Sequence, residues 1–280
     1  MELFPDITDP VHPAAPYIGG KRKLSRMICR AIDRIPHHTY AEAFMGMGGV
    51  FLRRTRVPPA EFINDWSEDV ATFYRFLQRH YVAFLDMLRY QVATRSGFER
   101  LLKVDPATQT DLERAARFLY LQRLAYGGKV TQRSFGVDPR GASGFDITRL
   151  VPLLEAIHER LARVTIERLH WSDFLARYDT PATLFYLDPP YFGCEDDYGK
   201  ELFDRSQFDL MATMLKMREG RFLLSLNDHP EVRRIFADFA LVEVNLTYSI
   251  SGTATDAREL VISNVEQARL GQLLESGKGR

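Results

Sequence analysis

The 280-residue sequence predicts an α/β protein with a doubly wound, mostly parallel sheet. Short apolar runs typical of buried strands alternate with segments of helical periodicity. A glycine-rich loop follows the first of these runs, and a later run ends abruptly in Asp-Pro-Pro-Tyr at residues 188–191. Polar residues placed directly after strands are typical of a sheet that presents a ligand site at its carboxyl end. The irregular, basic stretch of residues 66–149 interrupts the alternation and is the natural second domain.

Composition narrows the class of protein. The hydrophobic content is 45%, which is ordinary for a soluble protein. The 37 basic residues balance 37 acidic ones, which argues against a nucleic-acid coat protein, so the local distribution of charge matters more than its sum. The two cysteines, Cys29 and Cys194, form neither a disulfide framework nor a metal-ligand spacing. We therefore expect a reducing compartment and no metal. Neither a signal-peptide pattern nor a long apolar run occurs, so we expect a cytoplasmic location and no membrane partner.

The first recognisable pattern in the chain is a glycine turn, Tyr17 to Lys21, that leads into a predicted helix at residues 24–35. Gly19 and Gly20 allow the backbone to approach a ligand closely, and Lys21 would lie at the mouth of the site. The alternative is a solvated helix start, which is the commoner meaning of such a sequence.

A predicted strand at residues 40–43 leads into the glycine loop, which contains Gly46 and Gly48 and is followed by a predicted helix. Strand, glycine loop and helix in this order hold nucleotide-like ligands. The next strand, residues 61–65, ends at Asp65, whose carboxylate can accept hydrogen bonds from two ribose hydroxyls. A glycine loop alone is more often structural, but the loop together with Asp65 favours adenosine binding.

The middle of the chain is predicted to be helical and then irregular. Residues 66–90 form one long amphipathic pattern, and a second helix spans residues 111–126. Glycines break up the segment that follows. From residue 114 to residue 149, basic residues outnumber the two acidic ones, Asp138 and Asp146. This excess marks the segment as the phosphate-facing surface, and the alternative is a solvated loop. The basic residues are Arg114, Arg117, Arg123, Lys129, Arg133, Arg140 and Arg149.

Strands and helices alternate again toward the carboxyl terminus. Helices are predicted at residues 150–161 and 207–217. The predicted strands are residues 164–169, 184–187, 221–228, 241–250 and 259–264, the last of them antiparallel at the edge of the sheet.

The Asp-Pro-Pro-Tyr turn has the chemistry of a binding site. Neither Pro189 nor Pro190 can donate a backbone hydrogen bond, and both hold the backbone rigid. Asp188 adds an anionic acceptor and Tyr191 adds a flat ring. These groups suit a planar molecule with an amino substituent, such as a nucleobase, although a proline turn after an ordinary strand is the alternative.

Five motifs in order carry a family resemblance: Gly19-Gly20-Lys21, residues 42–48, Asp65, residues 119–123 and the Asp-Pro-Pro-Tyr turn. With them the chain resembles, over nearly its full length, the DNA adenine-N6 methyltransferases of the Dam type. The resemblance implies a Rossmann-like, seven-stranded AdoMet-dependent methyltransferase fold. It also implies that residues 1–65 and 150–280 form the catalytic domain and that residues 66–149 form an inserted, mostly helical target-recognition domain.

The resemblance further implies roles for individual residues. The methyl donor would be S-adenosyl-L-methionine (AdoMet), with no metal, and the partner would be double-stranded DNA with its target adenine flipped out. The turn formed by Asp188, Pro189, Pro190 and Tyr191 would be catalytic. The groups around AdoMet would be Tyr17, Gly20, Lys21, Phe44, Gly46, Gly48, Asp65, Asp173, Phe174 and Asp188. The candidates for DNA contact are Arg123, Lys129 and Arg133.

The chain departs from the family pattern at two positions: the first is a small change next to the glycine loop, and the second leaves the target sequence open. Ala43 stands where a proline is common, and Gly127 stands where an asparagine is common. An RNA adenine-N6 methyltransferase would share every motif, and a catalytically silent nucleic-acid-binding protein of the same fold is a further alternative. The sequence does not determine whether the protein is a homodimer or whether a restriction endonuclease accompanies it.

Overall fold

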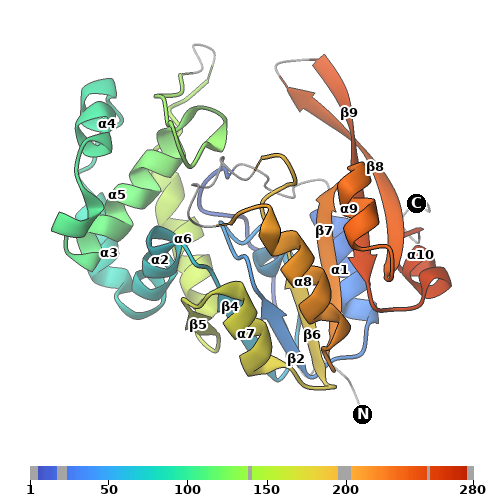
Figure 1. Cartoon of the computed structure of the whole chain (residues 1–280). Helices are drawn as coiled ribbons and strands as arrows, with labels where there is room; N and C mark the ends of the chain where they lie inside the picture. Colours follow the sequence, from blue (N-terminus) through green and yellow to red (C-terminus); the bar gives the residue numbers. More distant parts are fainter. Residues whose placement is uncertain (1–5, 18–23, 138–140, 195–202, 251–252, 276–280) are drawn as a thin grey trace.

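A seven-stranded, mostly parallel sheet forms the centre of the computed structural model, which describes residues 6–17, 24–137, 141–194, 203–250 and 253–275 (Figure 1). The strands lie in the order β5 (Thr165–Glu167), β4 (Ala60–Asn64), β2 (Thr39–Glu42), β6 (Thr183–Leu187), β7 (Arg221–Asn227), β9 (Thr253–Ser263) and β8 (Ala240–Ile250). The first five strands are parallel, and β9 is antiparallel to both of its neighbours. The predicted α/β, Rossmann-like fold class is therefore confirmed.

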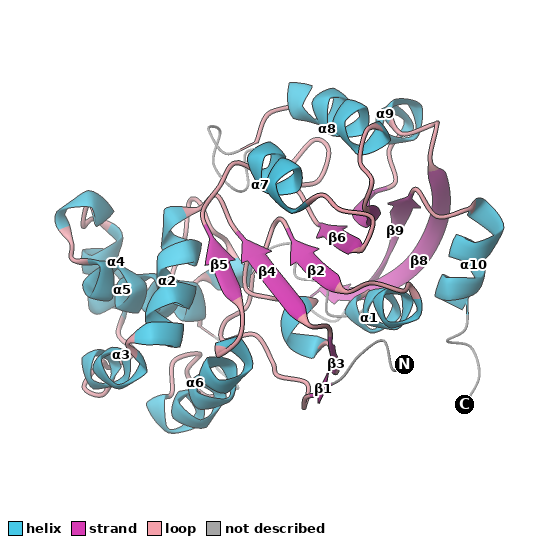
Figure 2. Cartoon of the chain, turned by 90° about the horizontal axis from the view of Figure 1, so that it is seen from below, coloured by secondary structure: helices cyan, strands magenta, loops and turns pink. Residues whose placement is uncertain are grey.

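Helices cover both faces of this sheet (Figure 2). One face packs against α7 (Trp171–Tyr178), α8 (Ser206–Lys216) and α9 (Pro230–Ile235), and the other packs against α1 (Ser25–Arg34) and α10 (Gln267–Glu275). Strand β6 is apolar enough to be covered on both faces: Phe185 and Leu187 pack on the side of α7, α8 and α9, and Leu184 and Tyr186 pack on the side of α1 and α10. Successive side chains of a strand point to opposite faces, so a strand covered on both sides is apolar throughout.

A helical region lies beside the β5 and β4 end of the sheet (Figure 1). It contains α2 (Glu68–Arg79), α3 (Tyr81–Leu88), α4 (Arg95–Leu102), α5 (Asp111–Leu124) and α6 (Ile147–Leu161), with 3₁₀ turns η2 (Pro106–Thr108) and η3 (Tyr126–Gly128). Phe73, Phe84 and Phe118 join its core to the cluster under α1. Helix α6 packs on α2 and α3, so the helical layer continues past residue 149. The separate recognition domain stays a prediction.

Three predicted elements differ from the structure. The long helix at residues 66–90 is two helices, because His80 leaves helical geometry (φ −127°, ψ 37°). Only a 3₁₀ turn, η1 (Phe51–Arg53), follows the glycine loop, because Arg54 is extended toward a buried partner, Glu61. The strand predicted at the edge, β9, is antiparallel as expected but lies inside the sheet, because β8 pairs along its outer side.

A buried ion cluster ties the helical region to the sheet. Glu61 on β4 accepts hydrogen bonds from Arg54 (Nη1 to Oε1, 2.7 Å) and from Arg160 of α6 (Nη1 to Oε2, 2.6 Å). The Arg54 guanidinium also lies 3.7 Å from the centre of the Tyr40 ring, and that of Arg160 lies 4.0 Å from the centre of the Phe51 ring. Buried charges are costly unless they are paired, and Glu61 pairs with both guanidinium groups, so the cluster fixes how these elements meet.

The N-terminal residues are anchored by a small second sheet that the sequence did not reveal. Strand β1 (Asp6–Ile7) pairs antiparallel with β3 (Arg56–Val57). No helix among the described residues is long and apolar enough to cross a membrane.

Candidate active site

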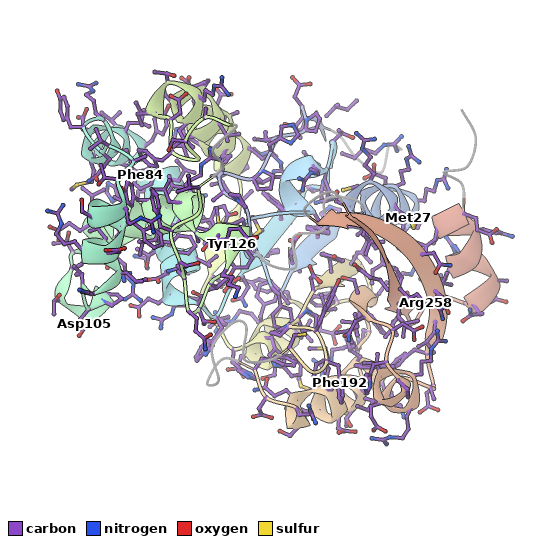
Figure 3. The ribbon with its side chains drawn as sticks, turned by 90° about the horizontal axis from the view of Figure 1, so that it is seen from above. Met27, Phe84, Asp105, Tyr126, Phe192 and Arg258 are labelled. Carbon is purple, nitrogen blue, oxygen red and sulfur yellow. The ribbon has the colours of Figure 1, made fainter. Side chains whose placement is uncertain are left out.

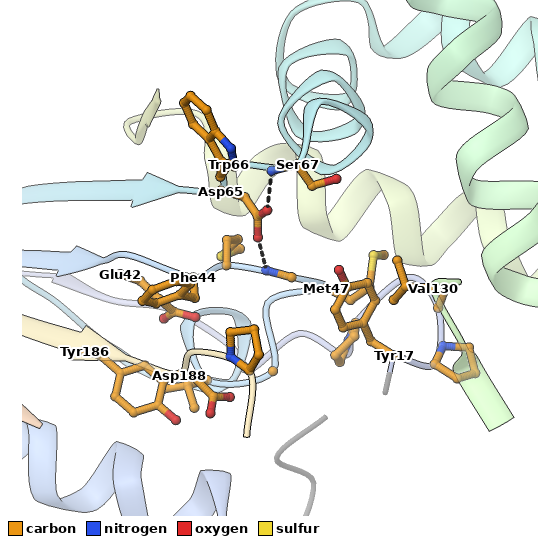
Figure 4. A pocket seen from close by; sticks show the side chains of 18 of the residues that line it. Tyr17, Glu42, Phe44, Met47, Asp65, Trp66, Ser67, Val130, Tyr186 and Asp188 are labelled. Carbon is orange, nitrogen blue, oxygen red and sulfur yellow. Dashed lines mark hydrogen bonds between the residues drawn. The ribbon is translucent and has the colours of Figure 1, made fainter. Parts of the chain in front are cut away.

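A cavity of about 500 Å³ opens at the carboxyl ends of β2, β4 and β6 (Figure 4). This volume is in the range of small-molecule sites, roughly 300–1,000 Å³. Of the residues predicted to form a site, it is lined by Tyr17, Phe44, Gly46, Asp65, Asp188, Pro190 and Arg123. Further lining residues are His12, Pro13, Ala15, Pro16, Glu42, Met45, Met47, Gly49, Val50, Arg53, Trp66, Ser67, Val130, Tyr186 and Phe203.

Asp65 organises one side of the cavity. Its carboxylate accepts hydrogen bonds from the backbone N–H of Gly46 (2.8 Å to Oδ2) and of Ser67 (2.9 Å to Oδ1), as Figure 4 shows. Burial raises the pKa of Asp65 to about 6, and these two hydrogen bonds oppose the rise. The end of β4 is thereby tied to the glycine loop after β2.

The two glycines of this loop serve different purposes. Gly46 has a φ of +48°, and a Cβ atom there would lie 3.0 Å from the Tyr17 ring, so the ring packs directly on the glycine at the cavity wall. Gly48 has a φ of +74°, and a Cβ atom there would meet Leu52 and Met45 at 2.8 Å. Gly48 therefore allows the loop to pack, whereas Gly46 shapes the cavity.

Asp188 lies on the opposite side, after β6. Its Oδ1 accepts a hydrogen bond of 3.0 Å from Ser225 Oγ, and Ser225 Oγ lies 2.9 Å from the Tyr186 hydroxyl. Pro190 lines the cavity beside it, while Pro189 is buried and Tyr191 is partly buried against the cluster under α8. The structure thus brings Asp188 and Asp65 to one cavity from strands that are far apart in sequence.

Glu42 is a cavity residue that sequence reasoning did not select. It ends β2, is 1% exposed, and accepts a hydrogen bond of 2.5 Å from the Tyr40 hydroxyl. Burial raises the pKa of Glu42 to about 8; the Tyr40 hydrogen bond and the Arg54 charge oppose the rise, and the charges of Asp188 and Glu61 add to it. Its position directly before the glycine loop, at the end of a strand, is the signal that could have identified it.

Of the predicted cofactor residues that the structure describes, Gly48, Asp173 and Phe174 are not part of the cavity lining. Phe174 is 0% exposed and packs on Tyr178 with the ring centres 5.1 Å apart, and Asp173 is exposed on α7. Gly20 and Lys21 lie outside the described residues. The cofactor roles of these five residues stay predictions.

The predicted DNA contacts fall into two groups. Arg123 donates to the carbonyl oxygens of Gly144 (2.6 Å) and Ala14 (3.2 Å), and Arg133 donates to Gln122 Oε1 (3.0 Å). Both guanidinium groups therefore hold neighbouring segments of the protein together. Burial lowers the pKa of each. Lys129, in contrast, is exposed.

Part of the local excess of positive charge lies inside the helical region. Arg114 forms ion pairs with Glu68 (3.0 Å) and Asp69 (2.5 Å), and Arg117 is 6% exposed and donates to the Leu101 carbonyl. The prediction that this whole basic set faces phosphate is wrong for these two residues, because they join α5 to α2 and α4.

The segment after α5 borders the sheet part of the molecule. Seen from above, Tyr126 lies between the helices that carry Phe84 and the part that carries Phe192 and Arg258 (Figure 3). The structure also places Gly128 against the backbone of residues 16–17, which form a wall of the cavity. Among the described residues, no cluster of three or more His, Cys, Asp or Glu side chains could hold a metal ion.

Comparison with known proteins gives one family. The model of the D12 class N6 adenine-specific DNA methyltransferases matches residues 17–250, which include both sides of the cavity. No curated protein matches the chain. Among solved structures, the chain is similar to a precorrin-8W decarboxylase of Methanobacterium thermoautotrophicum, with 10% identity, 86% of this chain and 88% of that chain covered, and a TM-score of 0.38. Because the family match spans most of its length, the chain belongs to the D12 class N6 adenine-specific DNA methyltransferases.

Proposed function

We propose that this protein transfers a methyl group from AdoMet to the N6 amino group of adenine at a specific site in double-stranded DNA. The observation that carries the proposal is that Asp65 and Asp188, which directly follow β4 and β6, border one cavity of about 500 Å³. A donor and an acceptor held in one cavity react as if within a single molecule, which lowers the entropic part of the barrier.

The cavity residues fit the proposed methyl donor. Asp65 would accept hydrogen bonds from ribose hydroxyls, and the exposed ring of Trp66 beside it offers a surface for a purine. Gly46 and Tyr17 form a wall in which a larger residue than glycine would not fit. When bound, AdoMet would supply an electrophilic methyl group.

Asp188 would act on the adenine. The N6 lone pair is delocalised into the ring, so the amine is a weak nucleophile until it becomes tetrahedral. The Asp188 carboxylate and the Pro189 carbonyl would accept its two N–H bonds and favour that geometry. Asp188 would also stabilise the positive charge that develops on the nitrogen as its bond to the methyl carbon forms and the bond between that carbon and the sulfur of the donor breaks. One N6 proton would then be released to solvent.

The target base would have to leave the duplex to reach Asp188. Extruding a base costs a few kcal/mol, and stacking on Tyr191 together with contacts to the DNA backbone would offset this cost.

Methyl transfer to defined substrates tests the proposal. Purified protein is incubated with tritiated AdoMet and duplex DNA, RNA of the same sequence, or no nucleic acid. We expect label in the DNA alone, as N6-methyladenine at one sequence when the product is sequenced. Label in RNA alone would identify an RNA enzyme, and no label in either would identify a protein without this activity.

A further inference from the structure

Strand β7 reaches the catalytic turn with two side chains that the proposed chemistry does not use. Ser225 and Asn227 are two residues apart on this strand, so both point to the same face of the sheet. Ser225 contacts Asp188 at the start of the turn, and Asn227 contacts Phe192 at its end. We propose that Ser225 and Asn227 are positioning residues that set the geometry of residues 188–192. This inference rests on the proposed function, because it requires that Asp188 meets the target base.

The hydrogen bonds at Ser225 have a defined direction. Its side chain is 0% exposed, and its Oγ is 3.0 Å from Asp188 Oδ1 and 2.9 Å from the Tyr186 hydroxyl. A carboxylate can only accept, so Ser225 gives its single proton to Asp188 and accepts the proton of Tyr186. The chain of hydrogen bonds from Tyr186 through Ser225 to Asp188 therefore holds the carboxylate in one orientation.

Asn227 holds the other end of the turn through the backbone. Its Oδ1 accepts a hydrogen bond of 2.9 Å from the Phe192 N–H, and its Nδ2 donates one of 3.0 Å to the Phe192 carbonyl. The Phe192 ring is also stacked on His229, with the ring centres 4.6 Å apart. Two antiparallel hydrogen bonds from one amide restrain both the position and the direction of the peptide.

Together these contacts fix a short turn at both ends, with Pro189 and Pro190 stiffening its middle. An acceptor that must meet an amine in the transition state is more effective when it needs no reorganisation. The contacts of Ser225 and Asn227 should therefore affect the chemical step and leave the binding of AdoMet, on the Asp65 side, unchanged.

The test uses Ser225→Ala and Asn227→Ala with two matched controls from the same sheet. Ser263 is also 0% exposed, and its Oγ donates to the Phe222 carbonyl at 2.6 Å. Asn264 also binds both polar backbone groups of its neighbours, accepting from Phe222 N–H and donating to the Gly220 carbonyl. Ser263 ends β9 and Asn264 follows it, and both lie beside the first residues of β7, at the opposite end of that strand from Ser225 and Asn227. Ser263→Ala and Asn264→Ala therefore remove equivalent hydrogen bonds away from the cavity.

The measurements are the single-turnover methylation rate on duplex DNA, the Kd of AdoMet by calorimetry and the Tm of each variant. Loss of a hydrogen bond to a charged group should lower the rate of Ser225→Ala by about ten- to a hundredfold, with the AdoMet Kd within about threefold. Asn227→Ala should show the same separation of rate from Kd. The two controls should lower Tm and leave the rate unchanged.

A milder variant covers the case in which Ser225→Ala does not fold. Tyr186→Phe removes only the first donor of this chain of hydrogen bonds, and we expect a smaller fall in rate, again without a change in AdoMet Kd. Rates equal to wild type in all three variants, or rates that fall only as much as in the controls, would overturn the inference while the proposed function stands. Wild-type protein that methylates no DNA would overturn both.

Discussion

At the scale of single residues, Asp188 is the group whose loss should remove activity. It faces the cavity from the end of β6 and is oriented by Ser225. We predict that Asp188→Ala lowers methyl transfer at least a hundredfold, corresponding to ~3 kcal/mol of transition-state stabilisation, and leaves AdoMet affinity within about tenfold. Asp188→Asn, which keeps the shape but not the charge, is the matched variant. A rate that retains a tenth of the wild-type value would contradict the assignment.

Asp65 should control AdoMet affinity instead. We predict that Asp65→Ala weakens AdoMet binding by about 1–3 kcal/mol, because ribose hydroxyls lose their acceptor and the Gly46 and Ser67 N–H groups lose theirs. Calorimetric titration measures this effect. Asp69→Asn is the control, because Asp69 pairs with Arg114 away from the cavity. Unchanged affinity in the Asp65 variant would move this residue out of the cofactor site.

Glu42 should make stability depend on pH. Its pKa in the folded protein is raised from 4.5 to about 8, chiefly by burial. Between these values the folded protein keeps a proton that the unfolded chain has released, so the free energy of unfolding falls as pH rises from about 5 to about 8. Glu42→Gln cannot titrate and should flatten this decline, whereas Glu99→Gln on the surface should not. Urea unfolding across the window measures both, and equal slopes in the wild type and Glu42→Gln would refute the prediction.

At the scale of elements, the segment after α5 should set how DNA is held. Lys129 is exposed, whereas Arg123 and Arg133 donate to groups of the protein. We predict that Lys129→Ala weakens binding to all DNA sequences alike and lowers the slope of log K against log salt by about 1, as expected for one phosphate contact. Binding titrations at two or more salt concentrations measure the slope.

Arg123, in the last turn of α5, and Arg133, in the segment after it, should behave differently from Lys129. If either reads a base, its alanine variant loses about 1–3 kcal/mol on the preferred sequence and less on altered ones, so discrimination falls. Methylation rates on a cognate duplex and its single-base variants measure this. Should the Arg123, Lys129 and Arg133 variants all keep the wild-type rate, salt slope and preference, recognition lies in another element.

The contact between α6 and the sheet depends on the buried ion cluster. We predict that Glu61→Ala destabilises the protein by about 3–5 kcal/mol, because Arg54 and Arg160 are left buried without their carboxylate. The exposed pair of Asp6 and Arg163 is the control, since breaking such a pair typically changes stability by less than about 1 kcal/mol. Urea unfolding of Glu61→Ala and Asp6→Ala compares them directly, and equal losses would show that burial adds nothing to the pair.

At the scale of the whole molecule, the sequence predicted the elements that local pattern determines. The five parallel strands and the glycine loop could be predicted because apolar runs and glycines report local backbone geometry. The position of β9 inside the sheet could not be predicted, because it depends on pairing with β7, which lies well before β9 in the sequence. The strand-end position of Glu42 was visible in the sequence, but its burial was not, because β2 becomes an inner strand only when β4 and β6 pair on either side of it.

The order of the strands in the sheet also determines when each pair of neighbouring strands can form during synthesis. Strand β2 lies between β4, which follows it closely in sequence, and β6, which follows only after the whole helical region. At a ribosomal rate of about 5–20 residues per second, roughly ten seconds separate the emergence of Asn64 from that of Thr183. During this interval the β6 side of β2 has no strand to pair with, so a nascent chain exposes an apolar edge at which chaperones would act. Catalytic competence therefore arrives late, only when β6 has closed the middle of the sheet.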